Sequence, residues 1–362
     1  LNPGSTPMEN LQFLTFLCAV IKGVDEYADL LRISAASAAN DHRLGANEAP
    51  PAIISIFMGE ELQGVLDALV SGDTYTSESM TFKIGVDALP DFPKDSTDRN
   101  RTSPFAFTGN RFEFRMVGSS ENIACPNHML NTIVASELSD IADKMEKVPA
   151  DQFKDELKKL LAEIVKEHKR VIFNGDGYSD AWVEEAAKRG LPNYKTTADC
   201  VPHYADEKNV KLFEKFGIFS KAEIEARVEI LLESYSKTIN IEALTMIDMA
   251  KKKYIPACLA YSKELADAIA VKKSIDVCTC VEKDLVKKVT DETEKAYDAV
   301  QKLEEVTAVA AAKTCMQEMA NAYRDTVLPV MDELRKAVDA LEVLLPSTMW
   351  PVPAYSEMIF NV

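Results

Sequence analysis

The sequence of 362 residues predicts an α+β protein in which residues 1–136 carry short strands with flanking helices and residues 137–362 are predominantly helical. The first part holds an apolar segment at 52–59 and the turn dipeptide Gly109-Asn110, both typical of strands and hairpins. The second part repeats apolar residues at three-and-four spacing over long stretches, which is typical of amphipathic helices. A chain of this length can bury a substantial core and hold two domains or subdomains.

Charge and cysteine content exclude several classes of protein. The net charge is −17, from 58 acidic and 41 basic residues, which argues against general nucleic-acid binding and attraction to anionic membranes. A local arginine cluster could still bind anionic substrates. Seven cysteines form no framework, and only Cys278 and Cys280 are close, so we expect reduced thiols and a cytoplasmic protein rather than a zinc or disulfide site.

The first helix follows Thr6-Pro7-Met8-Glu9, a capping box with proline at the first helical position. We expect it to run to about Arg32 and, because it is apolar nearly all round, to be buried. No apolar run is long enough to span a membrane. The apolar stretch 11–24 follows an acidic residue rather than a basic region and does not resemble a signal peptide.

A polar loop and an arginine-rich strand are the candidate functional segments. The loop, residues 40–51, carries charged side chains between glycine and two prolines; it is either a functional loop or a polar connector. In Arg111-Phe112-Glu113-Phe114-Arg115, alternation places both phenylalanines toward a core and the charged side chains on the other face. That face is either a solvated edge or a site for a metal and anionic ligands.

Capping residues and apolar spacing predict successive helices in the later part of the chain. One spans 127–146, and others begin near Asp151, after the cap Ser179, and after the capping box at Ser220. The last of these continues toward Pro256, and the pattern over 281–327 is interrupted at Pro329, which predicts a long helical hairpin or bundle. Further expectations are a surface position for His168 and docking of the tail at Trp350.

Common catalytic and binding motifs are missing from the sequence. Residues 174–185 resemble a calcium loop, but Ser179 stands where that loop needs glycine, so a capped turn explains them better. There is no Walker-type phosphate loop, no G-x-G-x-x-G after a strand and no G-x-S-x-G elbow. The four histidines are far apart and none has metal-ligand spacing with another.

Several long segments resemble one family. These are NPGSTPMEN, NDHRLGANEAPPAIISIFMG, NRTSPFAFTGNRFEFRMVGSSENIACPNHMLN, RVIFNGDGYSDAW, KTINIEALTMIDM and the WPVPAY tail. Together they resemble type III glutamine synthetases over essentially the whole chain. The resemblance implies that residues 1–136 are the carboxy-terminal part of the catalytic domain, with part of its sheet, and that residues 137–362 are a helical carboxy-terminal extension.

The resemblance also implies an activity and its partners. The family is a ligase of nitrogen assimilation and glutamine biosynthesis: it joins L-glutamate and ammonia, using ATP and Mg²⁺ or Mn²⁺, through γ-glutamyl phosphate. It assembles into ring-shaped homo-oligomers, by resemblance dodecamers.

Six residues of this sequence match the family's functional positions. By resemblance, Glu113 ligates a metal, Arg115 contacts the glutamate substrate and Arg111 lies near the nucleotide. Arg43 binds the substrate carboxylate. The catalytic pair would be Glu48, which closes over the site and takes a proton from ammonium, and Arg101, which offsets charge on the transferring phosphoryl group.

Two departures limit the resemblance. A second arginine of commoner classes is replaced by Ala106. The chain also begins at Leu1 without methionine, and the family's other metal ligands and glutamate-binding loop match no segment here. We therefore expect a retained part of a longer protein that makes no glutamine alone. Two alternatives stay open: a non-catalytic helical scaffold for assembly or regulation, and another phosphoryl-transfer ligase with the same sheet.

Overall fold

The computed structural model describes residues 1–4, 6–46, 49–75, 81–82, 92–93 and 103–360, and the chain divides into two compact units. Unit 1 is Leu1–Val228 and unit 2 is Glu229–Val362. The described residues are mostly helical with a small three-stranded mixed sheet, so the α+β class holds in this coarse form. No helix among them is both long and apolar enough to cross a membrane.

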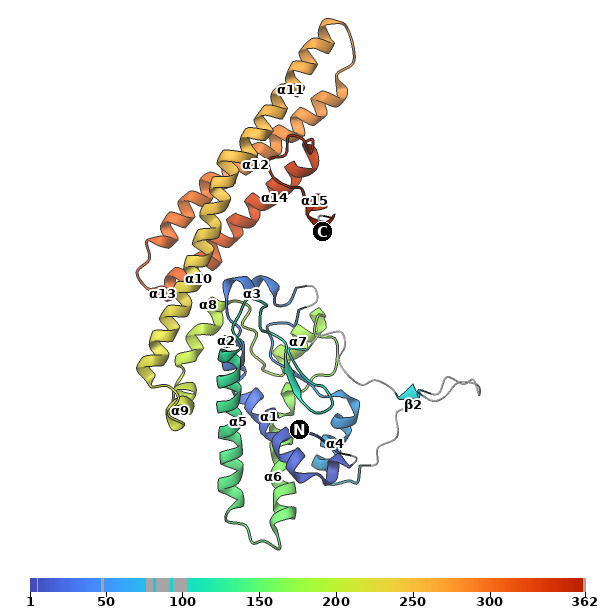
Figure 1. Ribbon diagram of the computed structural model, residues 1–362, viewed down its shortest axis with the longest axis vertical. Helices are drawn as coiled ribbons and strands as arrows, with labels where there is room; N and C mark the ends of the chain where they lie inside the picture. The colour runs from blue at the N-terminus through green and yellow to red at the C-terminus, as the bar shows by residue number, and fades with distance from the viewer. Residues whose placement is uncertain (5, 47–48, 76–80, 83–91, 94–102, 361–362) are drawn as a thin grey trace. The chain divides into compact units, whose positions relative to one another are not determined.

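Unit 1 is built around one buried helix, α1 (Leu11–Glu26), which packs against α5 (Ala124–Met145) and α6 (Phe153–His168). Figure 1 shows α5 and α6 as a hairpin beside it. The close approach of α1 and α5 requires Gly23, since a Cβ there would lie 2.5 Å from the Ile133 side chain. The other helices of this unit are α2 (Ala28–Ile33), α3 (Ala38–Arg43), α4 (Gly59–Ser71), α7 (Asp180–Lys188), α8 (Thr197–Cys200), α9 (Glu207–Lys215) and the start of α10 (Lys221–Met249).

The start of α1 differs from the expectation at two points. Pro7–Glu9 forms a short 3-10 turn, and the Asn10 side chain caps α1 by accepting a hydrogen bond from the Phe13 N–H at 3.0 Å. Thr6 makes no side-chain capping bond. Tyr27, with φ −120° and ψ 32°, ends α1 and separates it from α2, so the single helix expected up to Arg32 is two helices.

The sheet has the strand order β1 (Ile56–Phe57), β4 (Phe105–Phe107) and β5 (Phe112–Phe114). β1 and β4 are parallel, whereas β4 and β5 form an antiparallel hairpin in which Ala106 pairs with Glu113. The expected turn at Gly109-Asn110 joins them, and Gly109 has a φ of +90° that favours glycine. A separate pair, β2 (Thr81–Phe82) and β3 (Phe92–Pro93), is antiparallel.

The aromatic side chains of the hairpin face the core, as alternation predicts. The Phe112 ring stacks on Phe105 at 5.0 Å between centroids, and Phe114 meets Phe105 edge-on at 6.0 Å. Phe105 and Phe107 are fully buried, and Phe107 contacts Phe13 at the start of α1. Packing of the aromatic face against α1 therefore directs Glu113 to the opposite face.

His168 is buried, in contrast to the surface position expected from its lysine-rich neighbours. Its Nδ1 lies 2.9 Å from Asp25, a buried carboxylate that also accepts a hydrogen bond from Arg170 Nε at 2.7 Å. The last turn of α6 is thereby tied to α1. Charged neighbours in sequence did not reveal this position because His168 continues the buried stripe of α6 that includes Leu157, Leu161 and Ile164.

The compact units do not divide at residue 136, which lies inside the continuous helix α5. Residues after 136 supply α6, α7, α8 and α9 to unit 1, where α6 packs on α1, α8 on α2 and α9 on α5. A division at 136 between a catalytic domain and an extension therefore stays a prediction about the family's domains.

Unit 2 consists of the rest of α10, α11 (Ile255–Ser274), α12 (Cys280–Ala311), α13 (Met316–Ala322), α14 (Leu328–Leu344) and α15 (Tyr355–Phe360). The long helix α12 packs against both α11 and α14 (Figure 1). The tail docks as expected: the buried Trp350 stacks on Tyr254 with ring centroids 5.1 Å apart.

Neither Pro256 nor Pro329 breaks its helix. Each follows a π-helical turn, Ala250–Tyr254 and Tyr323–Val327 respectively. In these turns the N–H of Ile255 bonds to the Ala250 carbonyl, and that of Leu328 to the Tyr323 carbonyl, five residues back. The wider turn accommodates a residue that lacks an N–H and would otherwise clash with the preceding turn.

A candidate ligand-binding wall at the arginine-rich strand

Glu113 lies at the centre of the candidate site, on β5 between two arginines. Its Oε2 accepts a hydrogen bond from Arg115 Nη2 at 3.2 Å, and its Oε1 accepts one from the Thr108 hydroxyl at 3.2 Å. Arg111 Nε lies 3.4 Å from Oε1. The three charged side chains thus share one face of the hairpin, as the alternation in the sequence predicts.

The two arginines differ in how strongly the protein holds them. The Arg115 side chain is 13% exposed, whereas that of Arg111 is 71% exposed. Burial of Glu113 disfavours its charge, but hydrogen bonds from Arg115 and Thr108, with the charges of Arg115 and Arg111, outweigh this and lower the pKa of Glu113. At neutral pH the site presents a carboxylate flanked by guanidinium groups.

The structure brings Arg43, from a segment far away in the sequence, to this strand. Arg43 is the last residue of α3 and donates hydrogen bonds to the carbonyls of Met116 at 3.2 Å and Arg115 at 3.4 Å. Asn40, one turn earlier and buried, donates to the same Met116 carbonyl at 2.8 Å and accepts from Arg43 Nη1 at 3.2 Å. The end of α3 is therefore fastened to the residues that follow β5.

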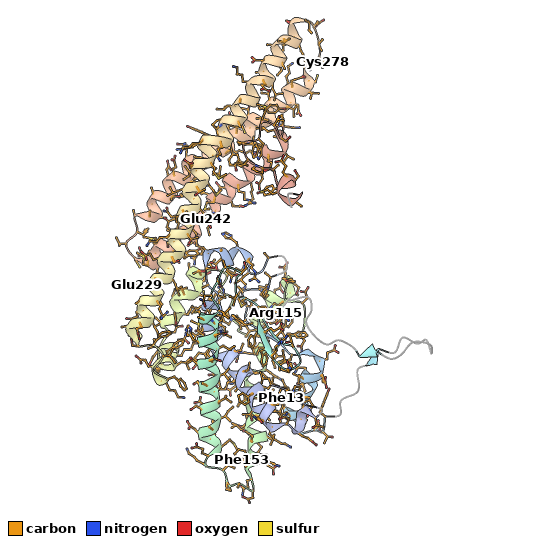
Figure 2. All side chains as sticks on the ribbon, in the orientation of Figure 1. Phe13, Arg115, Phe153, Glu229, Glu242 and Cys278 are labelled. Carbon is orange, nitrogen blue, oxygen red and sulfur yellow. The ribbon has the colours of Figure 1, made fainter. Side chains whose placement is uncertain are left out.

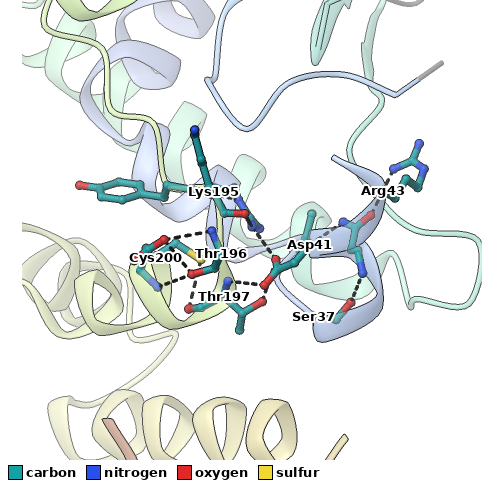
Figure 3. Close-up of polar contacts among 12 residues, drawn as sticks. Ser37, Asp41, Arg43, Lys195, Thr196, Thr197 and Cys200 are labelled. Carbon is teal, nitrogen blue, oxygen red and sulfur yellow. Dashed lines mark hydrogen bonds and ion pairs between the residues drawn. The ribbon is translucent and has the colours of Figure 1, made fainter. Parts of the chain in front are cut away.

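A buried ion pair positions α3 (Figure 3). Arg32 Nη2 donates to Asp41 Oδ1 at 2.7 Å, and Arg32 also donates to the carbonyls of Tyr194 and Lys195. The other oxygen of Asp41 accepts the Thr197 N–H at 2.6 Å. Burial raises the pKa of Asp41, although the charge of Arg32 and the bonds from Thr197 oppose this rise. The Arg32–Asp41 pair thus joins α2, α3 and the start of α8.

The sequence did not assign roles to Asn40, Asp41 or Thr108, which hold the predicted residues in place. Asn40 and Asp41 stand in the N-D-H-R segment directly before Arg43, and Ser37 caps their helix by accepting the Asn40 N–H. A serine three residues before Asn40 indicates a helix start, and therefore that these polar residues lie on a helix rather than in a loop. Two predicted residues, Glu48 and Arg101, lie outside the described residues.

Whether this site could bind a metal ion depends on how many oxygen ligands its side chains supply. An ionised carboxylate such as Glu113 is a suitable oxygen ligand for Mg²⁺ or Mn²⁺, but such ions require several oxygen ligands. Among the described residues, no three His, Cys, Asp or Glu side chains are grouped to hold a metal ion. Glu113 is therefore suited to be one ligand of a metal ion, and the ion would compete with Arg111 and Arg115 for its carboxylate oxygens.

Comparison with known proteins identifies what the chain resembles. The sequence profile of the glutamine synthetase C-terminal domain matches residues 156–273. A protein named glutamine synthetase from Butyrivibrio fibrisolvens is 46% identical over 100% of this chain and 52% of its own length. The type-3 glutamine synthetase of Dictyostelium discoideum is 42% identical over 99% of this chain and 50% of its own length.

The chain is similar to glutamine synthetases along its whole length. A third relative, the glutamine synthetase of Bacteroides fragilis (strain YCH46), is 38% identical over 99% of the chain and 51% of its own length. The chain thus spans about half the length of the curated relatives it matches. The matched profile covers helices from α6 to α11, and the similarity to the Butyrivibrio fibrisolvens protein covers the whole chain, including the segments that carry Arg43 and Glu113.

We expect replacement of Asp41 by alanine to lower the free energy of unfolding of unit 1 by about 3 kcal/mol, because the change leaves the buried Arg32 charge and the Thr197 N–H without this acceptor. Urea denaturation can be followed by Trp182, which is buried in unit 1, in a variant with Trp350→Phe.

Glu207→Ala serves as the control, since its ion pair with Lys211 lies at the surface, where water screens it, and should contribute little to stability. Equal effects of the two alanine variants would contradict an anchoring role for Asp41.

We expect the pKa of Glu113 to lie below its ordinary value of 4.5 and to rise more in Arg115→Gln than in Arg111→Gln. Arg115 both hydrogen bonds to the carboxylate and is mostly buried, whereas the charge of Arg111 is screened by water. Because the folded-state pKa is lowered, ionised Glu113 favours the folded state above pH 4.5, and this contribution is lost as the pH falls through the folded-state pKa.

Carbon-detected NMR of selectively labelled glutamate carboxyl groups measures this titration, with Glu113→Gln to assign the signal. A larger shift in the Arg111 variant would show that Arg115 is not the principal partner.

Proposed function

We propose that this chain supplies one wall of the active site of an ATP-dependent ligase that joins L-glutamate and ammonia to form L-glutamine. The observation that carries the proposal is the junction of α3 with the end of β5: Arg43 bonds to the carbonyl of Arg115, whose side chain bonds to Glu113. The names of the relatives supply the reaction class.

The proposed chemistry has two steps. The γ-carboxylate of glutamate attacks the terminal phosphorus of ATP and releases ADP, which forms γ-glutamyl phosphate. The nitrogen of ammonia then attacks the acyl carbon and releases phosphate. Both steps place several negative charges in one cavity, and guanidinium groups are suited to bind and offset them.

Arg43 and Arg115 are the proposed ligands of the glutamate substrate. Three hydrogen bonds to Asn40, Arg115 and Met116 occupy part of the Arg43 guanidinium, which has five N–H donors. Its Nε–H and the second hydrogen on Nη2 are the donors we assign to the substrate carboxylate. The bonds to backbone carbonyls hold the guanidinium in one orientation, which reduces the entropy lost when the anion binds.

Glu113 is the proposed metal ligand, and Arg111 is proposed to lie near the nucleotide. A bound Mg²⁺ or Mn²⁺ would neutralise charge on the phosphates of ATP and orient them. Since Glu113 supplies one oxygen-bearing side chain, we propose that the other ligands come from the remainder of the whole enzyme. Glu48 and Arg101 keep their predicted roles as proton acceptor and as the arginine at the transferring phosphoryl group.

Self-association is a second proposed property. Large apolar side chains are exposed on the part of α10 in unit 2 and on α11, namely Ile230, Ile241, Leu244 and Leu259. Exposed apolar groups of this size favour contact with another protein surface. We therefore propose that the helical part contacts other subunits in a ring-shaped homo-oligomer, which by resemblance is a dodecamer. The alternative is that the helical part serves as a scaffold without taking part in catalysis.

We expect Glu113→Gln in the whole enzyme to reduce glutamine formation by at least about 100-fold, because an amide cannot replace an anionic metal ligand. The measurement is phosphate release with glutamate, ammonia and ATP, together with γ-glutamyl transfer to hydroxylamine. Glu207→Gln, a surface change, should leave both rates unchanged.

The 362-residue chain alone should show no γ-glutamyl transfer, since Glu113 cannot hold the metal by itself. Robust turnover by this chain would contradict the proposal that other parts of the whole enzyme supply the remaining metal ligands. Full activity of the Glu113→Gln enzyme would contradict the proposal that Glu113 binds the metal.

A further inference from the structure

Two cysteines lie together at the turn between α11 and α12, within unit 2. Figure 2 labels Cys278 at the tip of this hairpin. The sulfur atoms of Cys278 and Cys280 are 2.8 Å apart, and both residues are exposed. Four of the seven cysteines are instead wholly or partly buried, so this pair combines mutual contact with access to solutes.

The surrounding turn fixes the backbone that carries the pair. The Val277 N–H donates to the Lys272 carbonyl at 2.9 Å, and the Lys283 N–H donates to the Thr279 carbonyl at 3.1 Å. The Lys272 side chain pairs with Glu282, which joins the end of α11 to the first turn of α12. Thr279, between the two cysteines, is buried. The two thiols thus project from an ordered turn.

The two sulfur atoms differ electrostatically. Cys280 is the first residue of α12. Its thiol and its backbone N–H donate to the Cys278 sulfur and lower the pKa of Cys278, and the same contact raises the pKa of Cys280. Amide groups at a helix N-terminus stabilise a thiolate in this way. The lowered pKa favours Cys278 as the attacking thiolate and leaves Cys280 as the resolving thiol.

We propose that Cys278 and Cys280 form a redox-active dithiol that closes to an intrachain disulfide by exchange with low-molecular-weight disulfides. The Cys278 thiolate attacks one sulfur of the small disulfide, which forms a mixed disulfide and releases one small thiolate. Cys280 then loses its proton and attacks the Cys278 sulfur, which releases the second small thiol. Two protein thiols are oxidised, and one small disulfide is reduced to two thiols.

The spacing of the sulfur atoms favours this exchange over metal binding. A disulfide bond is roughly 2.05 Å long. Two thiolates on one tetrahedral zinc ion lie nearly 4 Å apart, given Zn–S bonds of about 2.3 Å. A disulfide that closes across one intervening residue is strained, and strained, exposed disulfides are readily reduced. The pair is therefore suited to a reversible change rather than to a structural link.

Exposure of the 362-residue chain to glutathione disulfide, followed by alkylation, trypsin digestion and mass spectrometry, tests the proposal. The tryptic peptide Ser274–Lys283 contains both cysteines and no other. We expect this peptide to become lighter by two hydrogen atoms, without glutathione or the alkylating group. Cys315, the third exposed cysteine, should retain a glutathione adduct under the same conditions.

Two serine variants separate the steps. In Cys280→Ser the resolving thiol is missing, so glutathione should remain on Cys278 at a level at least about tenfold above that in the unchanged chain. In Cys278→Ser no second thiol is left to release the adduct, so glutathione should likewise remain on Cys280. Circular dichroism verifies that both variants keep their helix content.

Persistent glutathione on the peptide from the unchanged chain would overturn the proposal. So would a peptide that stays fully alkylated while Cys315 is modified. Addition of excess reduced glutathione should restore the dithiol, and a disulfide that resists this treatment would contradict the reversible role.

Discussion

The candidate site depends on one buried ion pair, that of Arg32 with Asp41. The Arg32 side chain is 1% exposed and that of Asp41 is 10% exposed, so neither charge could remain there without the other. Carbonyl groups of Tyr194 and Lys195 and the N–H of Thr197 complete the bonds of the pair. Segments more than 150 positions apart in the sequence thereby fix the orientation of a six-residue helix that is too short to hold its shape alone.

Polar contacts of α3 connect this ion pair to the candidate site on β5. Asn40 and Arg43 lie on the same helix as Asp41 and bond to the backbone that follows β5. On the other side of β5, the phenylalanine face packs on Phe105 and Phe107. The Arg-Glu-Arg face is therefore held both by aromatic packing beneath it and by polar bonds beside it. A site for anions needs such fixed donors, because they need not reorganise when charge arrives.

The sequence patterns correctly predicted those parts of the fold that depend on residues close together in the sequence. The Gly109 turn, the cap at Ser179 and the inward aromatic face of β5 depend on a few neighbouring residues, and the structure has each of them. The burial of His168 and the partners of Asp41 depend on contacts distant in sequence, which periodicity does not contain. The resemblance implies that Arg43 and Arg115 bind one substrate, but no spacing rule in the sequence predicts that Arg43 bonds to the carbonyls of Arg115 and Met116.

The π-helical turns before Pro256 and Pro329 have a consequence for how this sequence can change. Each turn inserts one residue into a helix, which rotates everything beyond it by roughly 100° relative to an uninterrupted α-helix. Loss of a single residue from either turn would restore α-helical spacing, and the ring of Pro256 or Pro329 would then clash with the preceding turn. Deletions should therefore be tolerated in connecting loops and not here.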